Sequence, residues 1–252
     1  MDETAPARPS PEVRPIPGQA HLPWAEVHFD ELDEAVWCEA SRRAAELGKT
    51  GLEAWTTEDR PATIAFLADR GYEEVRRYLR FELDVGGAPE PAAEPPPGIE
   101  LTTLAERPKL VDGLWAVAVE AYPDQPGQAD TTMPADGLES FRAWGVDPHP
   151  PQGYVLALAD GRVVGFGYVE VDGDAGRHGM TGVARDRRGR GVADAIKRAQ
   201  IAWAKRAGLA TLRTENEVRI PAMRVLNERY GYRPIPAEVV LRGPLASYTG
   251  SL

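Results

Sequence analysis

Residues 181–193 read TGVARDRRGRGVA, and this segment carries the most information about the fold. The pattern predicts a short strand at 178–184, a glycine-rich turn, and a helix at 192–207. A turn of this kind presents free backbone N–H groups and the positive end of a helix dipole to an anion. Gly189 and Gly191 let the backbone approach a phosphate closely, because they carry no Cβ. The segment therefore predicts a phosphate-binding turn.

Two well-known phosphate-binding motifs do not match this turn. Gly189-Arg190-Gly191 lacks the third glycine of a Rossmann fingerprint, and the preceding segments 154–159 and 163–171 read as a hairpin joined by Asp160-Gly161. A Walker A loop requires a lysine and then a serine or threonine after the glycine, whereas Val192-Ala193 follow here. The turn is therefore of a different class.

Composition and charge narrow the class of partner. The 252 residues are 42% hydrophobic with a formal net charge of −10, which allows a sizeable core and argues against a nucleic-acid partner. Cys38 is the single cysteine, which excludes an internal disulfide, and no Cys/His spacing suggests a metal site. The N-terminus carries no apolar leader and no apolar run is long enough to span a membrane. We expect a cytoplasmic protein without a membrane, nucleic-acid or metal partner, and a homodimer is left open.

Proline-rich segments divide the chain. Residues 1–20 are predicted to form a disordered arm, and the Pro/Gly-rich residues 86–98 a semi-rigid linker. Between them, residues 24–85 are predicted to form a small first domain. Residues 99–245 alternate between strand and helix patterns, and we expect them to form a larger second domain.

The two predicted domains are related by an internal repeat. The same ungapped shift that aligns Gly48 with Gly208 also aligns Gly71-Tyr72 with Gly231-Tyr232. The alternative is that two generic strand–helix units share their turn residues. If the repeat is real, the first domain corresponds only to the second half of the larger one. The acidic segment 28–33 then replaces the glycine-rich turn, so the first domain is not expected to bind a phosphate.

Several segments around the turn match one family. The motif Arg-x-x-Gly-x-Ala at 188–193 follows Thr181-Gly182-Val183, the next strand ends in Thr214-Glu215-Asn216, and residues 223–232 close the pattern. Together they resemble the GCN5-related N-acetyltransferase (GNAT) family over about residues 98–245. The resemblance implies an α/β GNAT fold, with a mixed, mostly antiparallel central sheet and helices on both faces. A partial, degenerate GNAT-like repeat precedes it here, a tandem arrangement similar to that of mycothiol synthase.

The resemblance implies direct transfer of the acetyl group of acetyl-CoA, the co-substrate, to an amine of a small molecule or peptide. Backbone groups near Gly182 and Val183 would hold the pantetheine arm and polarise the thioester carbonyl, and amides of the turn would hold the pyrophosphate. The sequence also predicts a helix over 109–120, and Glu120 and Tyr122 at its end are the expected contacts to the acceptor. The expected acetyl-CoA contacts are Gly182, Val183, Arg188, Gly189, Arg190, Gly191, Val192, Ala193 and Asn216.

The reaction also needs groups that handle protons, because an ammonium must lose a proton before it attacks. His178 in the predicted strand 178–184 and Glu170 in the predicted strand 163–171 are candidate bases; a solvent-facing histidine and an exposed acid are the alternatives. Asn227 stands where the family usually has the tyrosine that serves as general acid, and Tyr230 is the phenol nearby in sequence. These positions leave a second function open, that of a non-catalytic CoA-binding or regulatory protein.

Overall fold

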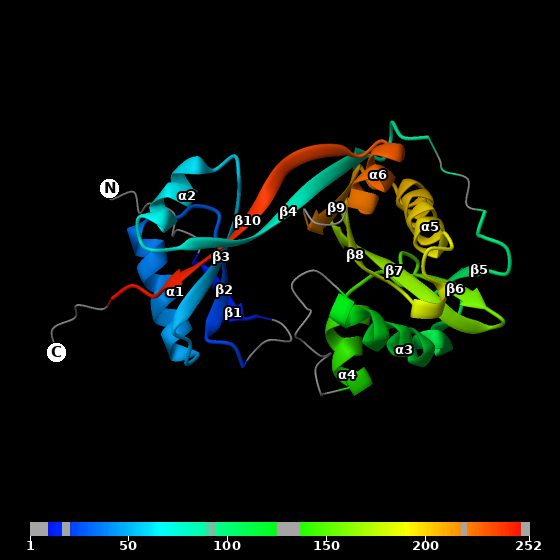
Figure 1. Ribbon diagram of the computed structural model, residues 1–252, viewed down its shortest axis with the longest axis horizontal. Helices are drawn as coiled ribbons and strands as arrows, with labels where there is room; N and C mark the ends of the chain where they lie inside the picture. Colours follow the sequence, from blue (N-terminus) through cyan, green and yellow to red (C-terminus); the bar gives the residue numbers. More distant parts are fainter. Residues whose placement is uncertain are drawn as a thin grey trace, which may run out of the picture. The chain divides into compact units, whose positions relative to one another are not determined.

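The computed structural model describes residues 10–16, 21–89, 91, 94–124, 137–217 and 221–247 (Figure 1). The chain divides into two compact units. Unit 1 comprises Met1–Leu79 together with Pro236–Leu252, and unit 2 comprises Arg80–Ile235. Within the described ranges, no helix is both long and apolar enough to cross a bilayer.

Unit 1 is a sheet with two helices. Its strand order is β1-β2-β3-β10-β4, in which β2 runs parallel to β3 and β3 antiparallel to β10. Residues 73–79 of β4 and 236–244 of β10 belong to this unit. The elements are β1 (Glu12–Pro15), β2 (Trp24–His28), α1 (Glu34–Glu46), β3 (Gly51–Thr57), α2 (Pro61–Ala68), β4 (Glu73–Asp84) and β10 (Arg233–Pro244).

Alternating side chains build the core of unit 1. Every second residue of a strand points to the same face, and on one face these residues are small or aliphatic. Pro61 begins α2 at a position where its missing N–H costs no hydrogen bond. The buried apolar cluster that results joins β2, β3, β10 and both helices, and consists of Ala25, Val27, Ala40, Ala44, Leu52, Ala54, Leu67, Tyr72, Val239 and Leu241.

The N-terminal region differs from the expectation. Residues 12–15 form β1, with Glu12 opposite His28 of β2, although a disordered arm was predicted over residues 1–20. Pairing with β2 satisfies backbone groups of β1, a long-range effect that the local composition does not show. Residues 1–9 and 17–20 of the predicted arm lie outside the described residues. The units also divide the chain at residues other than the predicted domain boundaries, because much of β10 joins unit 1 and the end of β4 joins unit 2.

Unit 2 is a mixed sheet between helices. Its strand order is β4-β9-β8-β7-β6-β5, antiparallel from β5 to β8 and parallel between β8 and β9. This is the predicted α/β architecture, so the expected fold class is confirmed. Short 3₁₀ or π turns cover Pro108–Leu110, Tyr122–Asp124, Arg142–Val146 and Arg185–Arg187. The main elements are β5 (Glu100–Thr103), α3 (Val111–Ala121), α4 (Gly137–Phe141), β6 (Val155–Ala159), β7 (Arg162–Asp172), β8 (Ala175–Val183), α5 (Val192–Arg206), β9 (Thr211–Glu217) and α6 (Pro221–Arg229).

The two faces of the unit 2 sheet can be assigned from β7. A Cβ added at Gly167 would lie 3.0 Å from Nε2 of Gln200, so Gly167 faces α5. Neighbours along a strand point to opposite faces, and Tyr168 packs in the cluster that contains Leu114 of α3. We call these two sides the α5 face and the α3 face.

The secondary structure agrees with the repeat. The shift that aligns Gly48 with Gly208 places the bounds of β3 (51–57) on those of β9 (211–217), and the bounds of β4 (73–84) on those of β10 (233–244). In unit 1 the neighbour of β3 is β10, whereas in unit 2 the neighbour of β9 is β4. Strand β4 ends the first repeat and β10 ends the second, and each lies beside a strand of the other repeat. The last strands of the two repeats are therefore exchanged.

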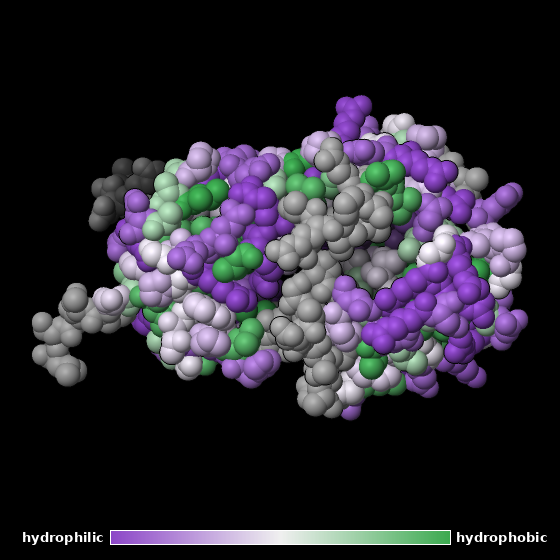
Figure 2. Space-filling view, viewed as in Figure 1, coloured by the Kyte–Doolittle hydropathy of each residue, from purple (hydrophilic) through white to green (hydrophobic). Residues whose placement is uncertain are grey.

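Large apolar side chains at the described surface are scattered. On the face shown in Figure 2, hydrophilic residues (purple) lie between small groups of apolar ones (green). Isolated exposed apolar residues are ordinary on a folded protein, so they need no functional explanation. The large ones are Leu47, Val75, Val119, Trp144, Val171 and Val225.

Candidate functional site

Strands β8 and β9 separate from each other within unit 2. They are paired at their first residues only, from Ala175 opposite Thr211 to Arg177 opposite Arg213. The other edge of β8 stays paired with β7 as far as Val183. In the described part of the chain, β8 therefore has an open edge over residues 178–183, and its backbone N–H and C=O groups there can pair with an extended ligand.

The turn after β8 leads into the N-terminus of α5. Gly189 and Gly191 have φ values of +70° and +79°, which side-chain-bearing residues rarely adopt, so glycine is needed at both. Gly191 is the N-cap of α5 and offers no side-chain acceptor to the first N–H groups of the helix. In unit 1, by contrast, the carboxylate of Asp33 caps α1 and accepts the N–H of Val36 at 2.9 Å. The N-terminus of α5 is therefore open to an anion, whereas the N-terminus of α1 is occupied by the Asp33 carboxylate.

Two acidic residues, one in the last turn of α3 and one just after it, fix this turn. Oε1 of Glu120 accepts the backbone N–H of Arg185 at 2.5 Å, and Oδ2 of Asp124 lies 2.8 Å from the Arg188 guanidinium. Glu120, which was expected to contact the acceptor, is thus bonded to the backbone of the turn. Tyr122, the other expected acceptor contact, is 7% exposed, and burial raises the pKa of its hydroxyl.

A cluster of polar side chains lies on the α5 face, where β8 leaves β9. His178 stands between Gln200 and Tyr232: its Nδ1 is 2.9 Å from Oε1 of Gln200, and its Nε2 is 2.6 Å from the Tyr232 hydroxyl. With the amide oxygen as acceptor, Nδ1 carries the proton and Nε2 accepts from Tyr232. Burial, and after it the positive charge of Lys197, holds the pKa of His178 well below its usual range. His178 is therefore neutral at pH 7, with both ring nitrogens engaged.

Lys197 and Asn227 extend this cluster. Nζ of Lys197 donates to Oδ1 of Asn227 at 2.5 Å and lies 4.7 Å from the ring centroid of Tyr232. The two residues are 5% and 0% exposed, and burial lowers the pKa of Lys197 to about 7. Nδ2 of Asn227 and Nε2 of Gln200 are buried without a partner among the described residues. Asn227, a candidate catalytic residue, is enclosed and bonded to a lysine that the sequence did not single out.

The equivalent positions of unit 1 are apolar. Through the repeat, Trp37, Ala40 and Leu67 correspond to the lysine, the glutamine and the asparagine of the cluster. Ala40 and Leu67 are 1% exposed within the core of unit 1, and the Trp37 indole N–H donates to Tyr72 at 3.1 Å. The repeat thus folds with an apolar interior at these positions. In unit 2, which has the glycine-rich turn, polar side chains stand at these positions instead. This difference indicates that the polar cluster has a role beyond stability.

Lys197→Met should reduce the dependence of stability on pH. Folding shifts the pKa of Lys197 from 10.5 to about 7, so between these values the unfolded chain binds the extra proton. The free energy of unfolding of the native protein is therefore expected to rise with pH across this window, by at most about 1.4 kcal/mol per pH unit. In urea unfolding at pH 7 and pH 9, the free energy of unfolding of Lys197→Met should depend less on pH than that of the native protein. The exposed control Lys109→Met should show the same pH dependence as the native protein. An equal pH dependence in all three proteins would contradict a buried neutral amine.

The remaining predicted residues lie at separate places. Glu170 accepts from the Arg177 guanidinium at 2.5 Å, and Tyr230 donates to Asp194 in the first turn of α5 at 2.5 Å. Burial and Asp194 raise the pKa of Tyr230 to about 12, so its proton is firmly held. Asn216 lies in β9, with its side chain outside the described part. The open part of β8, the turn and the first residues of α5 hold the other predicted contacts, Gly182, Val183, Arg190, Val192 and Ala193.

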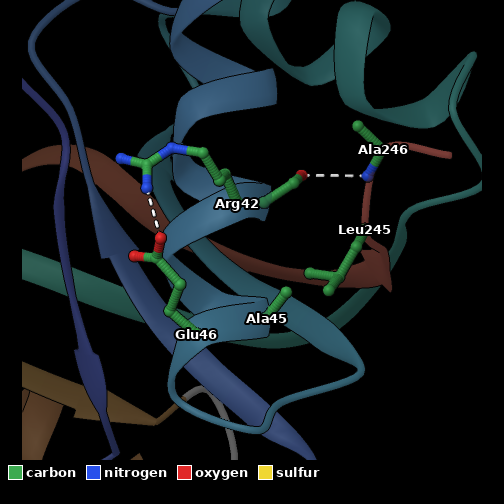
Figure 3. Close-up of a pocket in the computed structure, with 6 residues that line it drawn as sticks. Arg42, Ala45, Glu46, Leu245 and Ala246 are labelled. Carbon is green, nitrogen blue, oxygen red and sulfur yellow. Dashed lines mark hydrogen bonds and ion pairs between the residues drawn. The ribbon is translucent and has the colours of Figure 1, made fainter. Parts of the chain in front are cut away.

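An open depression in unit 1 offers no comparable chemistry. It lies between α1 and the segment after β10 (Figure 3), and the Ser41 hydroxyl at its side accepts the N–H of Ala246 at 2.9 Å. Arg42 and Glu46, the charged residues of its wall, are paired with each other. Among the described residues, no group of three or more His, Cys, Asp or Glu side chains is placed to hold a metal ion. The open strand edge and the helix N-terminus of unit 2 therefore remain the candidate site.

Comparison with known proteins agrees with this site. The model of the Acetyltransferase (GNAT) family matches residues 113–232, which include the turn and the open part of β8. The chain carries a GNAT acetyltransferase domain. Acetyl-CoA is the acetyl donor of GNAT acetyltransferases. The expected family and donor are therefore confirmed.

Curated relatives and solved structures extend the likeness beyond the GNAT domain. Mycothiol acetyltransferases of Thermobispora bispora and Thermomonospora curvata are each 28% identical, over 77% and 81% of this chain and 66% and 67% of the relatives. The chain thus spans about two thirds of the length of these relatives. A GCN5-related N-acetyltransferase from Sphaerobacter thermophilus matches with a TM-score of 0.67 at 20% identity, covering 93% of this chain and 76% of that one. A tandem GNAT protein from the clavulanic acid biosynthesis pathway gives 0.63 at 21% identity, covering 88% and 75%. These similarities support the tandem arrangement.

Sequence reasoning missed most of the buried cluster next to the GNAT turn. Lys197 and Gln200 lie three residues apart on the face of α5 that is otherwise apolar, and this spacing places both on one side of the helix. Comparison with Trp37 and Ala40 through the repeat would have shown two apolar positions turned polar. That difference between repeats was the available signal.

Proposed function

We propose that this chain transfers the acetyl group of acetyl-CoA directly to an amine of a small molecule or peptide. The observation that carries the proposal is the separation of β8 from β9 in the same unit as the uncapped N-terminus of α5. The open edge of β8 offers backbone groups to the pantetheine arm. The turn and the first N–H groups of α5 fit a diphosphate, because a Cβ added at Gly189 would meet no atom within 4 Å.

The residues of the chain bind and orient the reactants in this proposal. Backbone amides near Gly182 and Val183 polarise the thioester carbonyl, and Arg188, held by Asp124, adds positive charge at the turn. The amine must lose a proton before it attacks. A thiol with a pKa of about 8.5 is a tolerable leaving group, so transfer can proceed without an enzymic acid at Asn227.

The predicted domains have different roles in this proposal. Residues 99–245 act on acetyl-CoA, whereas residues 24–85 are a degenerate half-domain joined by the linker 86–98. The carboxylate of Asp33 occupies the helix N-terminus where a diphosphate would bind, which supports one acetyl-CoA site rather than two. We expect one acetyl-CoA bound per chain when it is titrated by calorimetry.

Thiol release tests the reaction. The full chain should release free CoA thiol from acetyl-CoA in the presence of one or more amines of a panel, and the acetylated amine should appear by mass spectrometry. The panel should include the substrate of the mycothiol acetyltransferases, because the curated relatives carry that name. Peptide N-termini, lysine and small primary amines complete it. Absence of acetyl-CoA binding would refute the proposal at its first step.

A non-catalytic CoA-binding protein is the second candidate. It is favoured by the burial of Asn227, which is 0% exposed and bonded to Lys197 rather than open to a ligand. Both candidates predict binding of acetyl-CoA, and amine-dependent thiol release distinguishes them. Binding with no release from any amine of the panel would favour the second.

A further inference from the structure

His178 is poorly placed to take a proton from an acceptor. Gln200 and Tyr232 engage its two ring nitrogens, and its side chain lies on the α5 face. A base must have an accessible lone pair within hydrogen-bond reach of the proton that it removes. The α3 face of the same strands therefore becomes the place to search for the base.

A second histidine lies on the α3 face beside the open part of β8. The ring of His149 stacks on Tyr168, with ring centroids 4.5 Å apart and an angle of 21° between the planes. Tyr168 is 7% exposed, and its hydroxyl forms a hydrogen bond with the backbone amide of Met180. Met180 belongs to residues 178–183, where β8 no longer pairs with β9. Tyr168 thus positions the imidazole of His149 against the strand that would hold the thioester.

The space for Tyr168 depends on a glycine in β8. A Cβ added at Gly179 would lie 2.1 Å from the Tyr168 ring, which is closer than any real contact. The ring therefore packs directly on the backbone of the open strand. Such packing fixes Tyr168, and through it the stacked His149, relative to the backbone groups of β8.

Charged residues surround His149 on this face. Arg177 follows Gly176 on β8 and precedes His178, so it points away from the α5 face. Its guanidinium is 2.5 Å from Glu170 of β7 and 3.8 Å from Glu215 of β9. Two carboxylates with one guanidinium leave an excess of negative charge, which attracts an ammonium group.

The protonation state of His149 suits a base. Burial lowers its pKa below 6.5, the charge of Glu170 opposes this shift, and the charge of Arg177 adds to it. The charged and titratable groups that face it are Tyr168 and Glu170 from β7, Arg177 from β8, and Glu215 through Arg177. Neutral imidazole therefore predominates at pH 7 and can accept a proton.

From this geometry we propose that His149 is the catalytic base that removes a proton from the acceptor amine; the inference rests on the proposed acetyl transfer. One proton of the ammonium passes to the imidazole, and the nitrogen lone pair then forms the C–N bond to the thioester carbon. The C–S bond breaks with its electron pair on sulfur. The second proton of the nitrogen passes to the thiolate, and His149 returns its proton to water.

Acceptors of different basicity test this role. With an amine of pKa about 10, His149→Gln should lower kcat/KM at pH 7 by about 10²- to 10⁴-fold, as expected for loss of a general base. With an amine of pKa about 5, already neutral at pH 7, the same substitution should lower kcat/KM less than tenfold. In the variant the rate with the basic amine should follow the fraction of free amine, so the acid limb of its pH profile should move from the pKa of His149 to that of the amine, about 10. A residue with a merely structural role would lower both rates alike.

Controls separate this inference from the proposed function. His21→Gln, at an exposed histidine of unit 1, should leave both rates unchanged, and acetyl-CoA affinity should be equal in all three proteins. Added imidazole should restore part of the rate of His149→Ala, which keeps the test valid if glutamine disturbs the stack on Tyr168. Equal losses with both amines, without rescue by imidazole, would overturn the role of His149 while wild-type activity still supported acetyl transfer. A wild-type protein inactive with every amine would overturn both.

Discussion

Acetyl-CoA affinity is expected to fall by at least about 100-fold when Gly191 is replaced by glutamate. The carboxylate would stand at the N-cap of α5, as that of Asp33 does on α1, and would accept the helix N–H groups that a diphosphate needs. It would also repel the diphosphate, since like charges about 4 Å apart cost on the order of 4 kcal/mol at an effective dielectric constant of about 20. Isothermal titration with acetyl-CoA measures the loss.

The other end of the same helix supplies a matched control. Gly208 has a φ of +77°, close to the +79° of Gly191, and a Cβ there would meet no atom within 4 Å. Gly208→Glu therefore introduces the same charge and a similar backbone strain of about 1–2 kcal/mol, but far from the N-terminus of α5. We expect both variants to lose comparable thermal stability and only Gly191→Glu to lose affinity. A comparable loss of affinity in both variants would mean that backbone strain causes the loss, and it would contradict binding of acetyl-CoA at the turn.

The fold of unit 2 could be predicted because its signals are local. Glycine at positive φ, a hairpin at Asp160-Gly161 and an apolar face on α5 each act within a few residues, so the sequence shows them directly. The bounds of β3 and β9 coincide under the shift that defines the repeat, which explains why the repeat was also visible. Turn residues recur at fixed positions when the elements between them have equal lengths.

The features that the sequence did not reveal depend on long-range contacts. Nothing near residues 12–15 indicates a strand, because β1 exists through its pairing with β2. The candidate site shows the same limit: the backbone turn was predicted, but the environment of each titratable side chain was not. His178 was recognised by its place on β8, yet its partners Gln200 and Tyr232 come from 22 and 54 residues away. His149 lies in a loop, where local sequence gives no sign of its stack on Tyr168.

Because the last strands are exchanged, the stability of unit 1 depends on β10. Residues 238–244 of β10 pair with β3, and Val239, Val240 and Leu241 are at most 2% exposed. Burying three such side chains contributes about 5–8 kcal/mol, which is comparable with the whole stability of a small domain. A chain ending at Ile235 should therefore have an unfolded unit 1. Residues 24–85, predicted as the first domain, would then not fold alone, because β10 is a central strand of their sheet.

Hydrogen exchange measured peptide by peptide can locate this effect. In the chain ending at Ile235, amides of β2, β3 and α1 should exchange at least about 1000-fold faster, because their core lacks the residues that β10 contributes. A chain ending at residue 247 keeps all of β10 and the bond from Ala246 to Ser41, so its exchange should match that of the full chain. Retained protection of β3 in the shorter chain would mean that another segment can take the place of β10 beside it. Within the repeat, the segment able to do so is β4, whose bounds match those of β10, so the same measurement tests whether the exchange of strands is required for unit 1 to fold.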